Sequence, residues 1–88
     1  MKIRREHSLG TTEARRRVDE IAADMGNRLN LSSKWRGDDL QVKGSGVDGT
    51  IAVSEDAIEI SINLGFALKL MESSIRTAIE GTMDKHLA

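Results

Sequence analysis

The sequence predicts an α+β fold in which two helices pack on one face of a mostly antiparallel sheet. Apolar residues repeat at helical spacing in residues 11–29 and 64–87, whereas the residues between these segments alternate with a period of two. Turns rich in glycine and acidic residues separate the alternating runs, which favours an antiparallel meander. The predicted order is β-α-β-β-β-α in a two-layer sandwich, and 88 residues suit one domain, so residues 1–88 are assigned to a single domain.

The first strand and first helix are predicted from residues 1–6 and 11–29. Met1, Ile3 and Arg5 lie on one face of the strand, and two cations lie on the other. The helix has one apolar side, which we expect to be buried. Its members are Ala14, Val18, Ile21, Ala22, Met25 and Leu29.

After this helix, strand patterns occur at residues 34–36, 40–43, 50–53 and 58–62, and the pattern of the first run is the weakest. The neighbours of the apolar residues in these runs are mostly polar, so we expect one face of the sheet to be covered by helices and the other to meet water. The residues predicted on the covered face are Leu40, Val42, Ile51, Val53, Ile58, Ile60 and Ile62.

The second helical segment contains an anomaly at Phe66 and Leu70. Its predicted buried stripe is Leu68, Met71, Ile75, Ala78, Ile79 and Thr82. In one straight helix, Phe66 and Leu70 would project on the side of Lys69, away from that stripe. Either Ser73 and Ser74 break the helix and let its first half rotate into the core, or the two apolar residues belong to a contact surface. Phe66, Lys69 and Leu70 are therefore the candidate interaction surface.

Composition and charge narrow the possible settings of the protein. Cysteine is absent, no apolar stretch approaches the ~20 residues needed to span a bilayer, and the polar residues that follow the N-terminal cations do not match a secretory signal. We therefore expect a cytoplasmic protein without integral membrane association. Residues 1–36 carry nine Lys/Arg against five Asp/Glu, and residues 37–88 carry four against nine. These halves are expected to attract each other within the fold or across a homodimer.

The segment 44–49 spells G-x-G-x-x-G, a pattern found in loops that bind phosphate groups. A dinucleotide-binding loop runs from a strand into a helix, whereas here a further strand pattern follows at residues 50–53. The context favours a glycine-rich hairpin, and we expect no nucleotide or other cofactor, with ATP and NAD failing to bind specifically.

His7, Trp35, Asp38 and Asp39 form a weaker alternative site. His7 lies beside Ser8, but adjacent residues rarely act on one reacting atom and no orienting group is evident. The two aspartates follow a glycine in a predicted turn, where they are ordinary turn residues. No catalytic or metal-binding residues are therefore assigned, although a ligand-binding or enzymatic module that uses the solvent-facing sheet remains the rival interpretation.

Nucleic-acid binding is the least favoured alternative. It would have to use Arg4, Arg5, Lys34 and Arg36, while the whole chain carries a net charge of −1. Nucleic-acid-binding domains are usually more basic than this.

Several runs resemble one protein family. They are IRREHSLG (3–10), EARRR (13–17), WRGDDL (35–40), GVDGTIAV (46–53) and LGFAL (64–68). In this order and spacing they are similar to the polyhydroxyalkanoic acid (PHA) system protein family. The resemblance implies a small bacterial cytoplasmic protein encoded near genes for polyester synthesis and granule proteins, without known catalytic residues. Residues 71–81 depart from the family pattern, which has a more regular, glutamate-rich helix there.

The resemblance and the residues together lead to one functional hypothesis. The protein is expected to be a non-catalytic accessory protein of polyhydroxyalkanoate metabolism. It would bind a granule-associated protein or the PHA granule surface.

Overall fold

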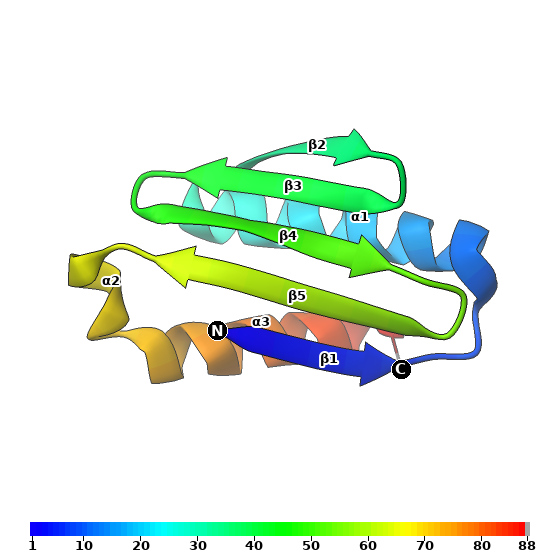
Figure 1. Ribbon diagram of the computed structural model, residues 1–88. Coiled ribbons are helices and arrows are strands. Elements are labelled where there is room, and N and C mark those ends of the chain that lie inside the picture. Colours follow the sequence, from blue (N-terminus) through cyan, green and yellow to red (C-terminus); the bar gives the residue numbers. More distant parts are fainter. Residues whose placement is uncertain (88) are drawn as a thin grey trace.

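A computed structural model describes residues 1–87, which form a five-stranded antiparallel sheet with helices on one face (Figure 1). The predicted α+β two-layer fold is confirmed. The elements are β1 (Lys2–Glu6), α1 (Gly10–Leu29), β2 (Ser32–Arg36), β3 (Asp39–Gly44), β4 (Val47–Val53), β5 (Ala57–Leu64), α2 (Phe66–Lys69) and α3 (Glu72–Leu87).

The strands lie in the order β1-β5-β4-β3-β2, so the last four form the predicted meander and the first strand adds beside β5. Four strands follow α1 rather than the three in the predicted order. The extra strand is the weak run around Trp35, which is lengthened to Ser32–Arg36 by pairing with β3.

One row of paired residues crosses the whole sheet and explains why its register is well defined. Trp35 lies opposite Leu40, Leu40 opposite Ile51, Ile51 opposite Ile60, and Ile60 opposite Ile3. All but Trp35 are buried. A slip of one residue between two strands would turn apolar side chains toward water, so hydrophobic burial fixes the pairing.

The core lies between this face and helices α1 and α3, and none of the helices in residues 1–87 covers the other face of the sheet (Figure 1). The predicted inner face of the sheet is buried throughout, and the predicted stripe of α1 is buried from Ala14 to Met25. The charge asymmetry is used within the fold, because Arg5 pairs with Asp84 and Arg15 with Asp38.

The stripe predicted for the second helical segment is wrong at two positions and misses a third. Met71 is 55% exposed and Ala78 is exposed, whereas Met83 is completely buried. The reason is that the segment is two helices, so α3 starts at Glu72 with its own helical phase. The positions buried in α3 are Ile75, Ile79, Thr82 and Met83.

Candidate interaction surface

The single turn of α2 projects from one end of the molecule, where β5 ends (Figure 1). Its backbone is closed by hydrogen bonds from the Leu68 and Lys69 amides to the Gly65 carbonyl, at 3.0 and 3.1 Å. The Met71 amide then donates to the Leu68 carbonyl at 2.9 Å, which makes the tight link into α3. The helix therefore breaks at Leu70 and Met71, not at Ser73 and Ser74 as the sequence suggested.

The hairpin between β3 and β4 anchors this turn. The Gly65 amide donates to the Gly46 carbonyl at 2.7 Å, and the partly buried Leu68 side chain packs against the core. Gly46 has a positive φ of 77°, and a Cβ on it would lie 3.3 Å from a Leu68 methyl carbon. A glycine at position 46 therefore allows both the tight turn and the close approach of α2.

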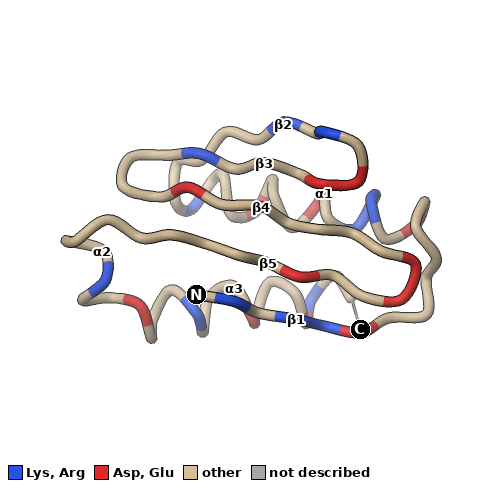
Figure 2. The backbone as a smooth tube through the Cα atoms, viewed as in Figure 1, with Lys and Arg blue, Asp and Glu red and all other residues tan. Residues whose placement is uncertain are grey.

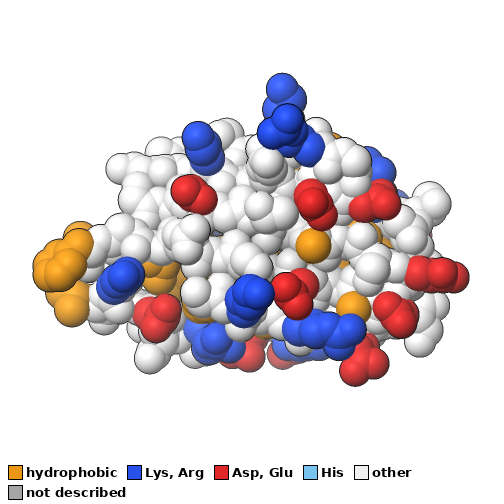
Figure 3. Space-filling view, viewed as in Figure 1, with side chains coloured by type: hydrophobic (Ala, Val, Ile, Leu, Met, Phe, Trp, Pro, Cys, Tyr) orange, Lys and Arg blue, Asp and Glu red, His pale blue; other side chains and the backbone are white. Residues whose placement is uncertain are grey.

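The outward side of the turn exposes three large apolar side chains. Phe66 is 88% exposed, Leu70 84% and Met71 55%. We call these three residues the α2 apolar surface, and Figure 3 shows hydrophobic side chains gathered at that end of the molecule. Lys69 is exposed on the same turn and pairs with no carboxylate among residues 1–87.

Of the two explanations for Phe66 and Leu70, burial through a break is wrong, because the break is present and both side chains remain exposed. Met71 was missed as a member of the surface because the sequence placed it in the core stripe. Because the helix breaks at Leu70 and Met71, the Met71 side chain faces outward instead of continuing the buried stripe.

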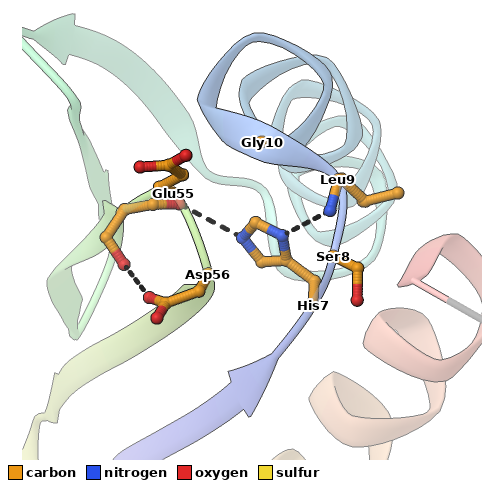
Figure 4. Close-up of a pocket in the computed structure, with 7 residues that line it drawn as sticks. His7, Ser8, Leu9, Gly10, Glu55 and Asp56 are labelled. Atoms are coloured by element: carbon orange, nitrogen blue, oxygen red, sulfur yellow. Dashed lines mark hydrogen bonds between the residues drawn. The ribbon is translucent and has the colours of Figure 1, made fainter.

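His7 lies at the other end of the sheet and closes the link between β1 and α1 onto the turn between β4 and β5 (Figure 4). Its Nδ1 accepts a hydrogen bond from the Leu9 amide at 3.1 Å. Its Nε2 lies 3.2 Å from the Ser54 carbonyl oxygen. Since Nδ1 is an acceptor, Nε2 carries the ring N–H and donates a hydrogen bond to that oxygen. The hollow beside it is wide and open, and both ring nitrogens are used to hold backbone.

Trp35 does not lie on the solvent-facing side of the sheet, so the predicted alternative site is wrong in that respect. Its Nε1 donates to Asp19 of α1 at 2.8 Å, and the Arg15 guanidinium lies 4.3 Å from its ring centroid. Arg15 also pairs with Asp38 at 3.1 Å. These contacts fasten the β2–β3 hairpin to α1.

The residues of the alternative site are also far apart. His7 follows β1 and Trp35 lies in β2, which are the two opposite edge strands. Four strand spacings separate these edges, or about 19 Å. Asp38 and Asp39 are exposed in the turn beside β2, so the four residues do not line one pocket.

The cations considered for nucleic-acid binding are divided in the same way. Arg4 and Arg5 lie on β1, whereas Lys34 and Arg36 lie on β2, with Asp48 and Glu59 on the strands between them (Figure 2). Residues 1–87 therefore do not join these four cations into one basic face.

The glycine-rich segment 44–49 is a hairpin, as predicted. Gly44 ends β3, Ser45 and Gly46 form the turn, and Gly49 lies within β4. A Cβ on Gly49 would lie 2.3 Å from the Ser61 carbonyl oxygen of β5, so this glycine serves close strand packing.

The described part of the chain offers neither a metal-ligand cluster nor a membrane span. Within residues 1–87, no three or more His, Asp or Glu side chains are grouped so that they could hold a metal ion. None of the helices described is both long and apolar enough to cross a membrane.

The fold and the exposed turn thus define a small two-layer α+β protein that presents an apolar end. The chain matches the family model described as "Putative polyhydroxyalkanoic acid system protein" over residues 1–87 and belongs to that family. Membership associates it with the polyhydroxyalkanoic acid system. No curated protein and no solved structure matches the chain.

Proposed function

We propose that this protein is a non-catalytic accessory protein of polyhydroxyalkanoate metabolism that acts in the bacterial cytoplasm at the polymer granule. It binds the granule surface or a granule-associated protein through the α2 apolar surface. The observation that carries this proposal is the exposure of Phe66, Leu70 and Met71 on one projecting turn, at 88%, 84% and 55%.

The physical basis is the free energy of removing these side chains from water. Complete burial of a large apolar side chain yields roughly 1.5–3 kcal/mol, and part of this is offset by the entropy lost on association. Three such side chains support reversible binding to an apolar surface. Because they occupy one turn at the end of the molecule, they can enter a surface or a pocket without rearrangement of the core.

Lys69 lies between these residues in sequence and keeps its charge in solvent. An ammonium group beside an apolar surface can remain hydrated while its aliphatic stem contacts the partner. Its charge also favours an anionic surface over a cationic one.

The hydrogen bonds of His7 support an accessory role rather than a catalytic one. A general base needs a nitrogen that can reach the substrate, whereas both nitrogens of His7 hold backbone groups of two loops. The rival interpretation, a ligand-binding module on the exposed face of the sheet, is also weakened because Trp35 lies on the helix side.

The test is co-sedimentation of the purified protein with native granules and with polyhydroxybutyrate particles that carry no protein. The variant is Phe66→Ser with Leu70→Ser. The matched control is Asp48→Asn with Asn63→Ser, which also changes two exposed side chains but on the open face of the sheet.

We expect the wild type and the control to sediment with native granules and the α2 variant to remain in the supernatant. Binding to bare particles would identify the polymer surface as the target, and binding to native granules alone would identify a granule protein. If the wild type binds neither preparation, or if the α2 variant binds as well as the control, the proposal is wrong.

A further inference from the structure

The two edges of the sheet are protected differently. At β1, Arg76 of α3 donates to the Lys2 carbonyl oxygen at 3.1 Å, and Arg5 pairs with Asp84 of α3. At β2, Figure 1 shows no element beyond the strand. An uncovered edge strand offers unpaired backbone groups to another chain.

The register shows which β2 groups face outward. The Val53 amide donates to the Asp38 carbonyl at 2.9 Å, so the backbone groups of Asp38 point toward β4. Bonding direction alternates along an antiparallel strand, so Asp39 and Gln41 bond toward β2, where they lie opposite Arg36 and Lys34. Ser33 and Trp35 therefore direct their amides and carbonyls to the open edge. Between residues 1 and 87, no element supplies a backbone partner to them.

The solvent side of this edge carries an excess of cations: Lys34, Arg36 and Lys43 lie there, and Asp39 and Asp48 lie opposite Arg36 and Lys43 on the neighbouring strands. Trp35 faces α1, so its neighbours Lys34 and Arg36 face the opposite side, with Lys43 of β3 beside them. In residues 1–87 no carboxylate lies within 4.0 Å of these three cations. By contrast, Lys2, Arg4 and Arg5 of β1 each have an acidic partner.

A small hollow lies between the cations. It measures about 220 Å³ and is lined by Ser32, Ser33, Lys34, Gln41 and Lys43. Its lining offers two ammonium groups and neutral donors, which suit a carboxylate side chain.

We propose that the β2 edge, residues 32–36, binds an extended acidic segment of a partner protein as a sixth strand of the sheet. The backbone of the segment bonds to Ser33 and Trp35. Its acidic side chains lie on the solvent side next to Lys34 and Arg36, and the alternate side chains lie beside the partly buried Trp35 ring. The recognised pattern is acidic and apolar residues in alternation.

A second copy of this chain does not fit the edge. Two β2 strands paired with each other would bring Lys34 and Arg36 of one copy close to the same cations of the other. The β1 edge of a second copy also presents Lys2 and Arg4 and is held by α3. Charge complementarity therefore selects a different, acidic chain.

The probe is a blocked synthetic peptide, Ser-Val-Glu-Thr-Glu-Val-Glu-Ser, and its control has lysine in place of each glutamate. Binding is followed by Trp35 fluorescence and by amide shifts and hydrogen exchange in NMR. We expect the acidic peptide to shift residues 32–36 and to protect the Ser33 and Trp35 amides, and the lysine peptide to have no effect.

Two variants separate the backbone from the charge contribution. Ser33→Pro removes an outward amide that the sheet does not use, so it should abolish binding while the fold is kept. Lys34→Glu should lower the affinity for the acidic peptide by roughly fivefold or more and should create affinity for the lysine peptide. Arg4→Glu on β1 is the matched control and should change neither affinity.

Equal binding of both peptides, amide shifts centred away from β2, or unchanged affinity in Lys34→Glu would overturn the proposal. A dimer in sedimentation that Ser33→Pro dissolves would also overturn it, in favour of a second copy. If Ser33→Pro fails to fold, the affinities of wild type and Lys34→Glu for the two peptides test the proposal alone. The preference for the acidic peptide should then change toward the lysine peptide in Lys34→Glu.

Discussion

The Nε2 atom of His86, in the last turn of α3, lies 2.7 Å from an Asp24 carboxylate oxygen of α1. Arg17 of α1 donates to the His86 carbonyl oxygen at 2.5 Å, so side chain and backbone of this residue are both held. The hydrogen bond from His86 is the first cause that lowers the pKa of Asp24, and the nearby Lys85 adds to it. These contacts fasten the end of α3 to α1.

Replacing His86 with Ala should raise the pKa of Asp24 toward its ordinary value of 3.8. Because the pKa of Asp24 is lower in the folded state, its charge stabilises the fold above about pH 3.8 and this contribution is lost as the pH falls through the folded-state value. The thermal midpoints of wild type and His86→Ala should therefore differ most above about pH 3.8 and converge in acid. An Asp24 carboxyl titration by NMR that is the same in both proteins would contradict this.

A second carboxylate, Glu13, should titrate at an unusually low pH. Hydrogen bonds from Arg16 and then Arg17 lower the pKa of Glu13 from 4.5 to about 2. The stability that this charge contributes is complete above about pH 4.5 and is lost as the pH falls toward about 2. The difference in stability between wild type and Glu13→Gln should therefore shrink over that interval. A Glu13 titration midpoint near 4.5 would show that the two arginines do not hold it in solution.

Ile60 should be among the most sensitive core positions. It has no exposed surface, and it lies in the row of paired residues between Ile51 and Ile3. Ile60→Ala should lower the free energy of unfolding by about 2–5 kcal/mol, because it loses apolar burial and leaves a cavity. In chemical denaturation, Ser61→Ala on the opposite face is the control and should change stability by less than about 0.5 kcal/mol. A similarly small loss for Ile60→Ala would contradict its place in the core.

The sheet could be predicted from the sequence, because apolar and polar residues alternate along each strand when one face of the sheet is buried. Each of the residues predicted on the inner face, from Leu40 to Ile62, is buried, since a single covered face requires a period of two. The edge position of β1 could not be predicted from the sequence. Ile3 pairs with Ile60 across a long stretch of intervening chain, and no local pattern specifies that neighbour.

Only part of the candidate surface could be predicted from the sequence. Phe66 and Leu70 were identified because they do not fit the apolar stripe of one straight helix. Met71 was missed because it does fit that stripe, and its exposure depends on where the helix breaks. The contact of His86 was not predicted either, because only the packing of α3 on α1 brings it to Asp24. Trp35 was assigned to the wrong face because its partner Asp19 lies on another element.

The two sides of the α2 turn should contribute differently to stability. Leu68 is partly buried and packs against the core near Gly46, whereas Phe66 is 88% exposed. Leu68→Ala should therefore lower the free energy of unfolding by about 1–2 kcal/mol, since part of its apolar surface returns to water. Phe66→Ala should change it by less than about 0.5 kcal/mol.

Urea denaturation at two protein concentrations measures both effects, and the Gly46 amide in NMR reports whether α2 keeps its place on the hairpin. We expect Leu68→Ala to shift that amide and Phe66→Ala to leave it unchanged, because only Leu68 lies against Gly46. An equal loss of stability in both variants at both concentrations would mean that Phe66 is buried in the monomer. A loss for Phe66→Ala that appears only when the protein is concentrated would instead place Phe66 in a contact between two copies, and the α2 apolar surface would then be unavailable to the granule in the dimer.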